Sequence, residues 1–113
     1  MRILKYELEI TDIQVIRVEG DVPQILSVAE QNGKLMMWAF VRENSSLKST
    51  ITINIVGTGN KTDDYLLSKY NFIGTVLMRN SFVWHVFAVV SYVEQPLQEG
   101  LKEGLQGGLM SAT

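Results

Sequence analysis

Phe82-Val-Trp-His-Val-Phe-Ala-Val-Val90 is the stretch of sequence that decides the fold. In an extended chain successive side chains point to opposite faces, so Trp84 and Val86 share one face while His85 and Phe87 share the other. Both faces are mainly apolar, which predicts a central β-strand that is covered on each side. The second face also carries His85, the single histidine of the chain.

The composition is typical of one globular domain with a modest core. The chain has 113 residues, of which 46% are hydrophobic and 19% are charged, so it is not a disordered segment. The absence of cysteine excludes a disulfide framework and a thiolate metal site. The first residues lack an apolar signal segment, and no apolar run approaches the roughly 18 residues of a membrane helix. We therefore expect a soluble, cytoplasmic protein without a membrane partner.

The charged residues give no basis for binding duplex nucleic acid. The net charge is −2, and no two Lys or Arg residues are adjacent. Affinity for a duplex depends mainly on neutralising phosphates, so we expect no partner of that class.

The dipeptide Asn32-Gly33 predicts a β-hairpin, because both residues tolerate the positive φ of a type I′ turn. The flanking strands are Ile25–Gln31 and Lys34–Val41. A two-residue loop would create four pairs of opposite residues: Gln31 with Lys34, Ala29 with Met36, Ser27 with Trp38, and Ile25 with Phe40.

Alternating patterns predict further strands. Leu4–Ile10 is typical of a half-exposed strand, and Ser49–Val56 places its isoleucines on one face. Between them, Ile13–Val18 changes the phase of its apolar residues, which predicts a β-bulge or a bend.

The last strand before the opening stretch is joined to it through Arg79-Asn80. If these two residues form the whole turn, Gly74 lies opposite His85, and Thr75 lies opposite Trp84. A glycine beside an aromatic ring leaves the ring room.

Six or seven strands with short links and almost no helix predict a small antiparallel β-sandwich or barrel over residues 1–93. Leu66–Lys69 is compatible with one helical turn. Residues 94–113 differ in character, because leucine and glycine recur every four residues, at Leu97, Leu101, Leu105, Leu109, Gly100, Gly104 and Gly108. We expect this tail to be flexible or to form a helix that orders against a partner subunit.

His85 is the obvious candidate for catalysis, yet the sequence offers it no recognisable partner. Ser81 and Ser91 make no nucleophile motif, and acid–base catalysis needs a second group within reach. We therefore expect no catalytic residue, with His85 as a packing or pocket-lining side chain; a nucleotide hydrolase built on it is the alternative. One histidine and scattered carboxylates, including Asp63-Asp64, give no metal-ligand spacing, and we expect no cofactor.

Gly57-Thr-Gly-Asn60 allows two interpretations. Its amides could form an anion-binding nest with Lys61 beside it, or it could be a turn at a strand end. Aromatic and basic residues at other strand ends could join it around a pocket. We predict a ligand-binding set that consists of Thr58, Asn60, Lys61, Tyr70, Arg79, Asn80, Trp84 and His85.

Several motifs, in order, resemble a family of small uncharacterised bacteriophage and prophage proteins. They are Lys5-Tyr-Glu-Leu-x-Ile-Thr-Asp-x-Gln14, Ile25-Leu-Ser-Val-x-x-Gln-Asn-Gly33 with Trp38-Ala39, Gly57-Thr-Gly59, Phe72-Ile-Gly-Thr75 and Trp84-His-Val-Phe87. The resemblance covers about residues 3–88, and residues 91–113 depart from the pattern. It implies an accessory phage gene that acts in the cytoplasm of an infected bacterium, and it transfers no activity to any residue.

Two main functions are compatible with these features. The first is a non-enzymatic counter-defence protein that sequesters a small nucleotide-derived immune signal. The second is a structural or interaction protein, either a virion component or an accessory that docks on a host protein. Under either function we expect a homo-oligomer, because a short chain with two-sided apolar strands must cover that surface.

Overall fold

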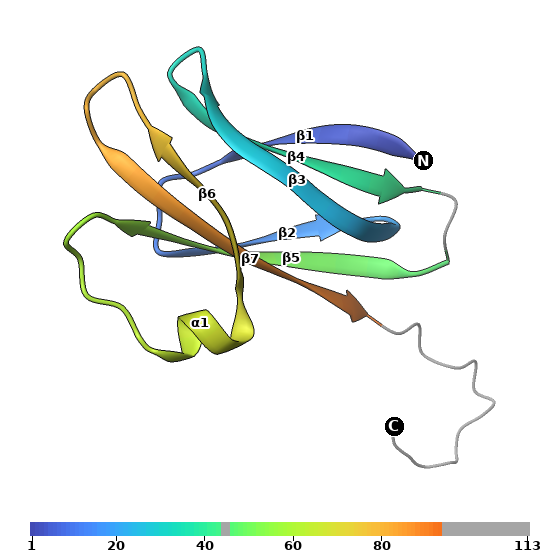
Figure 1. Cartoon of the computed structure of the whole chain (residues 1–113). Helices are drawn as coiled ribbons and strands as arrows, with labels where there is room; N and C mark the ends of the chain where they lie inside the picture. The colour runs from blue at the N-terminus through green and yellow to red at the C-terminus, as the bar shows by residue number, and fades with distance from the viewer. Residues whose placement is uncertain (44–45, 94–113) are drawn as a thin grey trace.

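The computed structural model describes residues 1–43 and 46–93, and these form an antiparallel β-sandwich (Figure 1). The fold class predicted from the sequence is therefore confirmed, with strand the dominant structure. The elements are β1 (Arg2–Leu8), β2 (Ile13–Val18), β3 (Asp21–Gln31), β4 (Lys34–Arg42), β5 (Lys48–Gly57), α1 (Tyr65–Lys69), β6 (Asn71–Leu77) and β7 (Val83–Val93). The predicted Leu/Gly tail lies outside the described residues. None of the helices within the described ranges has the length and apolar character needed to cross a membrane.

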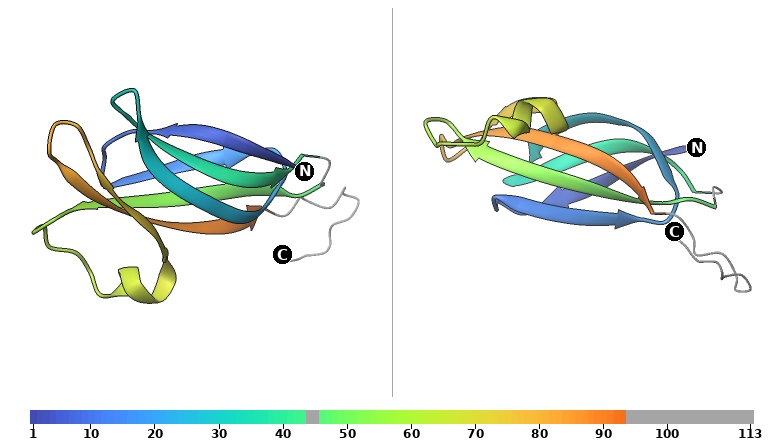
Figure 2. Two further views of the ribbon diagram at one scale, coloured as in Figure 1. Left: turned by 45° about the horizontal axis from the view of Figure 1, so that its top comes forward. Right: turned by 90° about the horizontal axis from the view of Figure 1, so that it is seen from below.

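The strands divide into two sheets, which the views in Figure 2 show as two layers. Sheet A has the order β1-β4-β3, and sheet B has the order β2-β5-β7-β6. β7 lies between two partners, as the opening stretch of sequence predicts. β5 and β6 both pair antiparallel with β7, so they run parallel to each other, and the chain between them must cross one face of sheet B.

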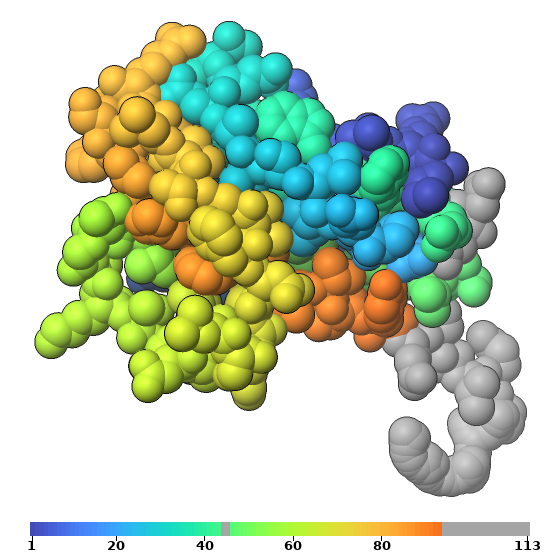
Figure 3. Space-filling model, in the orientation of Figure 1, coloured from blue at the N-terminus to red at the C-terminus, as the bar shows by residue number. Residues whose placement is uncertain are grey.

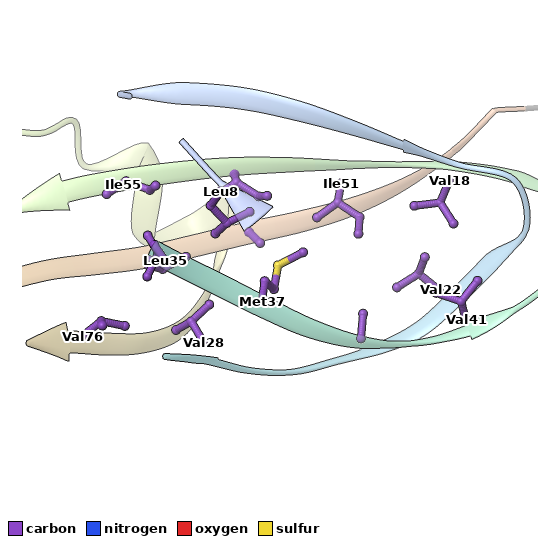
Figure 4. Packing of buried hydrophobic residues seen from close by; sticks show 14 of the residues in the cluster. Leu8, Val18, Val22, Val28, Leu35, Met37, Val41, Ile51, Ile55 and Val76 are labelled. Atoms are coloured by element: carbon purple, nitrogen blue, oxygen red, sulfur yellow. The ribbon is translucent and has the colours of Figure 1, made fainter. Parts of the chain in front are cut away.

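The core lies between the two sheets, where side chains from both inner faces meet (Figure 4). Met37 of β4 and Ile51 of β5 are fully buried there. The inner face of β7 contributes Val86 and Ala88, which are also buried. Burying each large apolar side chain contributes about 1.5–3 kcal/mol, so this layer is the main source of stability.

The β3–β4 hairpin confirms most of its predicted register. Asn32 and Gly33 both have positive φ, of 55° and 81°, as a type I′ turn requires. The three pairs nearest the turn are as predicted. The fourth is wrong, because a register shift between Ile25 and Ser27 places Ile25 opposite Ala39, and Gln24 opposite Phe40.

The predicted register of the β6–β7 hairpin is wrong by one residue in the half next to the turn. Thr75, and not Gly74, lies opposite His85. The turn is longer than predicted, because Ser81 adopts a positive φ of 74° and its N–H donates to the Met78 carbonyl at 2.9 Å. A type I turn followed by a left-handed residue adds one residue to the loop, which shifts the pairs from Leu77 back to Gly74. A second register shift, between Phe72 and Gly74, restores the predicted register at the start of β6.

Gly74 has a different role from the one predicted for it. It lies opposite Val86 on the inner face, and a Cβ atom placed on it would be 3.0 Å from the side chain of Val28 in β3. The glycine therefore allows β6 and β3 to approach each other closely.

The edges formed by β3 and β6 close one side of the sandwich. Glu30 of β3 accepts a hydrogen bond from the backbone N–H of Arg79 and forms an ion pair with its guanidinium at 2.8 Å. Figure 3 shows the side chains of β3 lying directly against those of β6. This side of the molecule therefore leaves no long free strand edge.

The β-bulge or bend predicted within β2 is absent from the described pairing. β2 pairs with β5 in one continuous register. Ile16 and Val18 point into the sandwich, whereas Ile13 and Val15 point outward and remain 54% and 50% exposed. The phase change in the sequence thus reflects apolar residues on both faces of an edge strand.

Adjacent methionines test this assignment of faces. We expect Met37→Ala to lower the free energy of unfolding by about 2–5 kcal/mol, because it leaves a cavity between the sheets. Met36→Ala is the matched control on the outer face of β4, and we expect it to cost about 1 kcal/mol or less. Urea denaturation followed by tryptophan fluorescence measures both, and a larger loss for Met36→Ala would contradict the register.

Candidate functional site

Residues 58–70 form a crossover that links β5 to β6 over the outer face of sheet B (Figure 1). Its anchor is Leu66 of α1, which is only 3% exposed although it lies outside the core between the sheets. The next residue, Leu67, is 81% exposed. One buried leucine therefore holds a segment that is otherwise mainly polar and open to solvent.

A pocket of about 440 Å³ lies between this crossover and the sheet, and we call it the crossover pocket. Sheet B contributes strand residues from β5, β6 and β7, and the crossover supplies the rest. Its lining consists of Val56, Gly57, Thr58, Gly59, Asn60, Thr62, Asp63, Asp64, Leu66, Leu67, Phe72, Thr75, His85 and Phe87. Its volume falls in the range of about 300–1,000 Å³ that is usual for small-molecule sites.

His85 is held in this pocket by two threonine hydroxyl groups. Its Nε2 atom lies 2.8 Å from Oγ1 of Thr58, and its Nδ1 atom lies 2.9 Å from Oγ1 of Thr75. A neutral imidazole has one donor and one acceptor nitrogen, so one hydroxyl donates to the ring and the other accepts from it. Both ring nitrogens are engaged, and the ring is fixed in orientation.

This arrangement differs from a nucleophile–histidine–carboxylate triad. Within residues 1–43 and 46–93, no carboxylate is hydrogen-bonded to His85, so the ring has no acidic partner to stabilise an imidazolium. The same ranges contain no group of three or more His, Asp or Glu residues able to hold a metal ion. The geometry is typical of a wall residue held in place by its neighbours, and the polar groups left for a ligand are the two threonine hydroxyls.

The Gly57–Asn60 stretch is a turn at the end of β5. The N–H of Asn60 donates to the Gly57 carbonyl at 3.1 Å, and Gly59 has φ of 89°, which is typical of a type II turn. The backbone N–H of Asn60 is therefore used within the turn. Of the two interpretations of the sequence, the structure favours the turn.

The predicted ligand-binding residues do not all lie together. Thr58, Asn60 and His85 line the crossover pocket. Lys61 lines a neighbouring depression of about 430 Å³ on the other side of the crossover. Tyr70 follows α1, and its ring contacts that of Tyr65 at 6.4 Å between centroids.

The three other predicted residues lie away from the pocket. Trp84 points toward the interior of the sandwich and packs against Gly57, where a Cβ atom would be 3.1 Å from its ring. Arg79 is paired with Glu30, and the Asn80 side chain accepts a hydrogen bond from the N–H of Phe82. These contacts stabilise the fold around β7.

Sequence reasoning missed the pocket's acidic and aromatic lining. Asp63 and Asp64 border it, while none of its lining residues is Lys or Arg. Phe72 and Phe87 form an edge-to-face pair at 5.4 Å on its floor. One feature of the sequence could have indicated this lining: the link between β5 and β6 is too long for a hairpin, so it had to cover part of the sheet. Two carboxylates without a cation disfavour an anion in this pocket.

Comparison with known proteins places the chain in one family. The family model described as Domain of unknown function (DUF7352) matches residues 1–96, and the chain belongs to this family. No curated protein matches the chain, and no solved structure does.

The two leucines of α1 test the anchoring of the crossover. We expect Leu66→Ala to accelerate amide hydrogen exchange over residues 58–70, because it removes about 2–3 kcal/mol of burial from a segment with few other contacts. Leu67→Ala is the exposed control and should leave exchange unchanged. Equal effects of the two variants on the crossover would contradict the assignment of Leu66 as its anchor.

Proposed function

We propose that this member of the DUF7352 family is a non-enzymatic binding protein that takes up a small nucleotide-derived molecule in the crossover pocket. The observation that carries the proposal is the fixed row of Thr58, His85 and Thr75 beside an exposed aromatic side chain. Such a row offers oriented polar contacts without a partner for catalysis.

The aromatic wall suits a flat ligand. Phe72 is 58% exposed, and its ring makes an edge-to-face contact with that of Phe87. Stacking of a base on an aromatic side chain contributes about 1–3 kcal/mol, which is sufficient to hold a small ligand when polar contacts orient it. The two threonine hydroxyls and the side-chain amide of Asn60 can supply those contacts to a base edge or a ribose.

The charges of the pocket limit which part of a nucleotide it accepts. Asp63 and Asp64 would repel a phosphate at the lining. We therefore assign the base or ribose to the pocket and leave the phosphates in solvent. This differs from the phosphate-binding nest considered for the Gly57–Asn60 stretch.

The biological role rests on the motifs that resemble small phage and prophage proteins. On that basis the chain would act in an infected bacterium, where binding and sequestering a nucleotide-derived signal would weaken the host's immune response. The proposal thus combines the geometry of the pocket with a phage origin inferred from the sequence motifs.

One observation favours the alternative, docking on a virion or host protein. The outer face of β4 presents Met36, Trp38 and Phe40, which are only half-buried, and Ile3 beside them is 54% exposed. Rows of exposed aromatic and apolar side chains are common at protein interfaces. In this alternative the outer face of sheet A would be the functional surface.

Calorimetry with cyclic nucleotides, ADP-ribose derivatives and plain nucleosides tests the binding proposal. We expect at least one of these to bind, and Thr75→Val to weaken it about tenfold, because the variant leaves a His85 nitrogen unpaired. Trp38→Ala, on the opposite sheet, is the control and should bind as the wild type does.

The result that would overturn the proposal is a folded wild-type protein that binds none of these compounds. Loss of counter-defence activity in Trp38→Ala, with activity retained in Thr75→Val, would instead favour the docking alternative.

A further inference from the structure

The sandwich has four edge strands, and they are protected to different degrees. β3 and β6 lie against each other and are joined by the Glu30–Arg79 pair. β1 carries charged side chains along its length, namely Arg2, Lys5 and Glu7. Charges on an edge discourage pairing with another chain. β2 has only one charged residue, Arg17, and exposes Ile13 and Val15.

The backbone groups of β2 show which residues face its free edge. The N–H of Ile55 in β5 donates to the carbonyl of Asp12 at 3.1 Å. In an antiparallel pair such bonds recur at every second residue, so the even-numbered residues of β2 bond to β5. Ile13, Val15 and Arg17 therefore direct their N–H and C=O groups outward.

Thr11 already satisfies one of these outward groups. Its hydroxyl donates to the carbonyl of Ile13 at 3.1 Å, and that oxygen retains a second lone pair. The outward backbone groups of β2 from Ile13 to Arg17 can therefore still form hydrogen bonds with a further strand.

This edge is complementary to a copy of itself. A two-fold axis at Val15 would place Val15 opposite Val15 of the partner subunit, and Ile13 opposite Arg17 of the partner subunit. Each of these residues faces the edge, so every pair would exchange backbone hydrogen bonds. The two valines would also cover each other on the outer face.

The charged residues near β2 favour a second copy of the chain as the partner of this edge. Within the described ranges Arg17 has no ion pair, and neither do Asp12 and Asp63, which border the depression beside Ile13. Lys61 is the one cation among the residues lining that depression. Arg17 of the partner subunit, opposite Ile13, would lie at the mouth of this depression and meet the two carboxylates, and the contact would occur twice by symmetry.

We propose that two copies of the chain pair antiparallel through β2. This joins two four-stranded sheets into one continuous sheet of eight strands. Both crossover pockets then lie on one face of the joined sheet. The inference does not depend on the ligand proposed above.

Sedimentation velocity on the full chain, with circular dichroism to verify folding, tests the dimer. We expect a wild-type dimer and a monomeric Val15→Lys variant, because two lysines would face each other at the axis. Ile3→Lys is the matched control on the β1 edge, with similar exposure at the substituted residue, and it should stay dimeric. A wild-type monomer, or a Val15→Lys dimer as tight as the wild type, would overturn the proposal.

A charge-reversal pair tests the register. Arg17→Glu should weaken the dimer about tenfold or more, and adding Asp63→Arg should restore at least part of that loss. If Arg17→Glu dissociates no more readily than the wild type, the assigned pairing is wrong, even if a dimer forms.

Discussion

The insertion of β7 between β5 and β6 is the constraint on which the rest of the structure depends. It makes β5 and β6 parallel, so the link between them cannot be a hairpin and must cross the outer face of sheet B. That crossing explains why an apolar residue such as Phe87 on the outer face of β7 is half-covered. It also creates the space in which Thr58 meets His85. The candidate site is therefore a consequence of strand order.

Local chemistry made part of this fold predictable. Asn32-Gly33 indicates a type I′ turn because both residues accept positive φ, and the isoleucines of β5 alternate because only one face of that strand meets the core. The two-sided apolar pattern of β7 likewise predicted a central strand. The errors in strand register arose where one residue changes the pairing, at the bulge near Ile25 and at Ser81. A serine with positive φ is uncommon, so its sequence gives little warning.

The site was harder to predict, because its geometry is set by residues distant in sequence. Thr58 and Thr75 reach opposite sides of one ring only through the strand order and the corrected β6–β7 register. Trp84 and His85 are neighbours in sequence, yet one faces the core and the other the pocket. Asp63 was not among the predicted ligand-binding residues, because nothing in the sequence shows which surface a crossover covers. Strand patterns predict which residues share a face, but not which loop lies over that face.

The order of strands also has a consequence for how the chain acquires its structure. Two pairs of strands are adjacent in sequence and can form early, namely β3 with β4 and β6 with β7. β1 and β2, in contrast, can pair only after their later partners, β4 and β5, are present. Distant pairings of this kind slow folding, often to milliseconds or longer. During synthesis on the ribosome β2 emerges well before β5, so the apolar residues on both of its faces stay uncovered in the interval. The segment most exposed to misassembly during biosynthesis is thus β2, near the start of the chain.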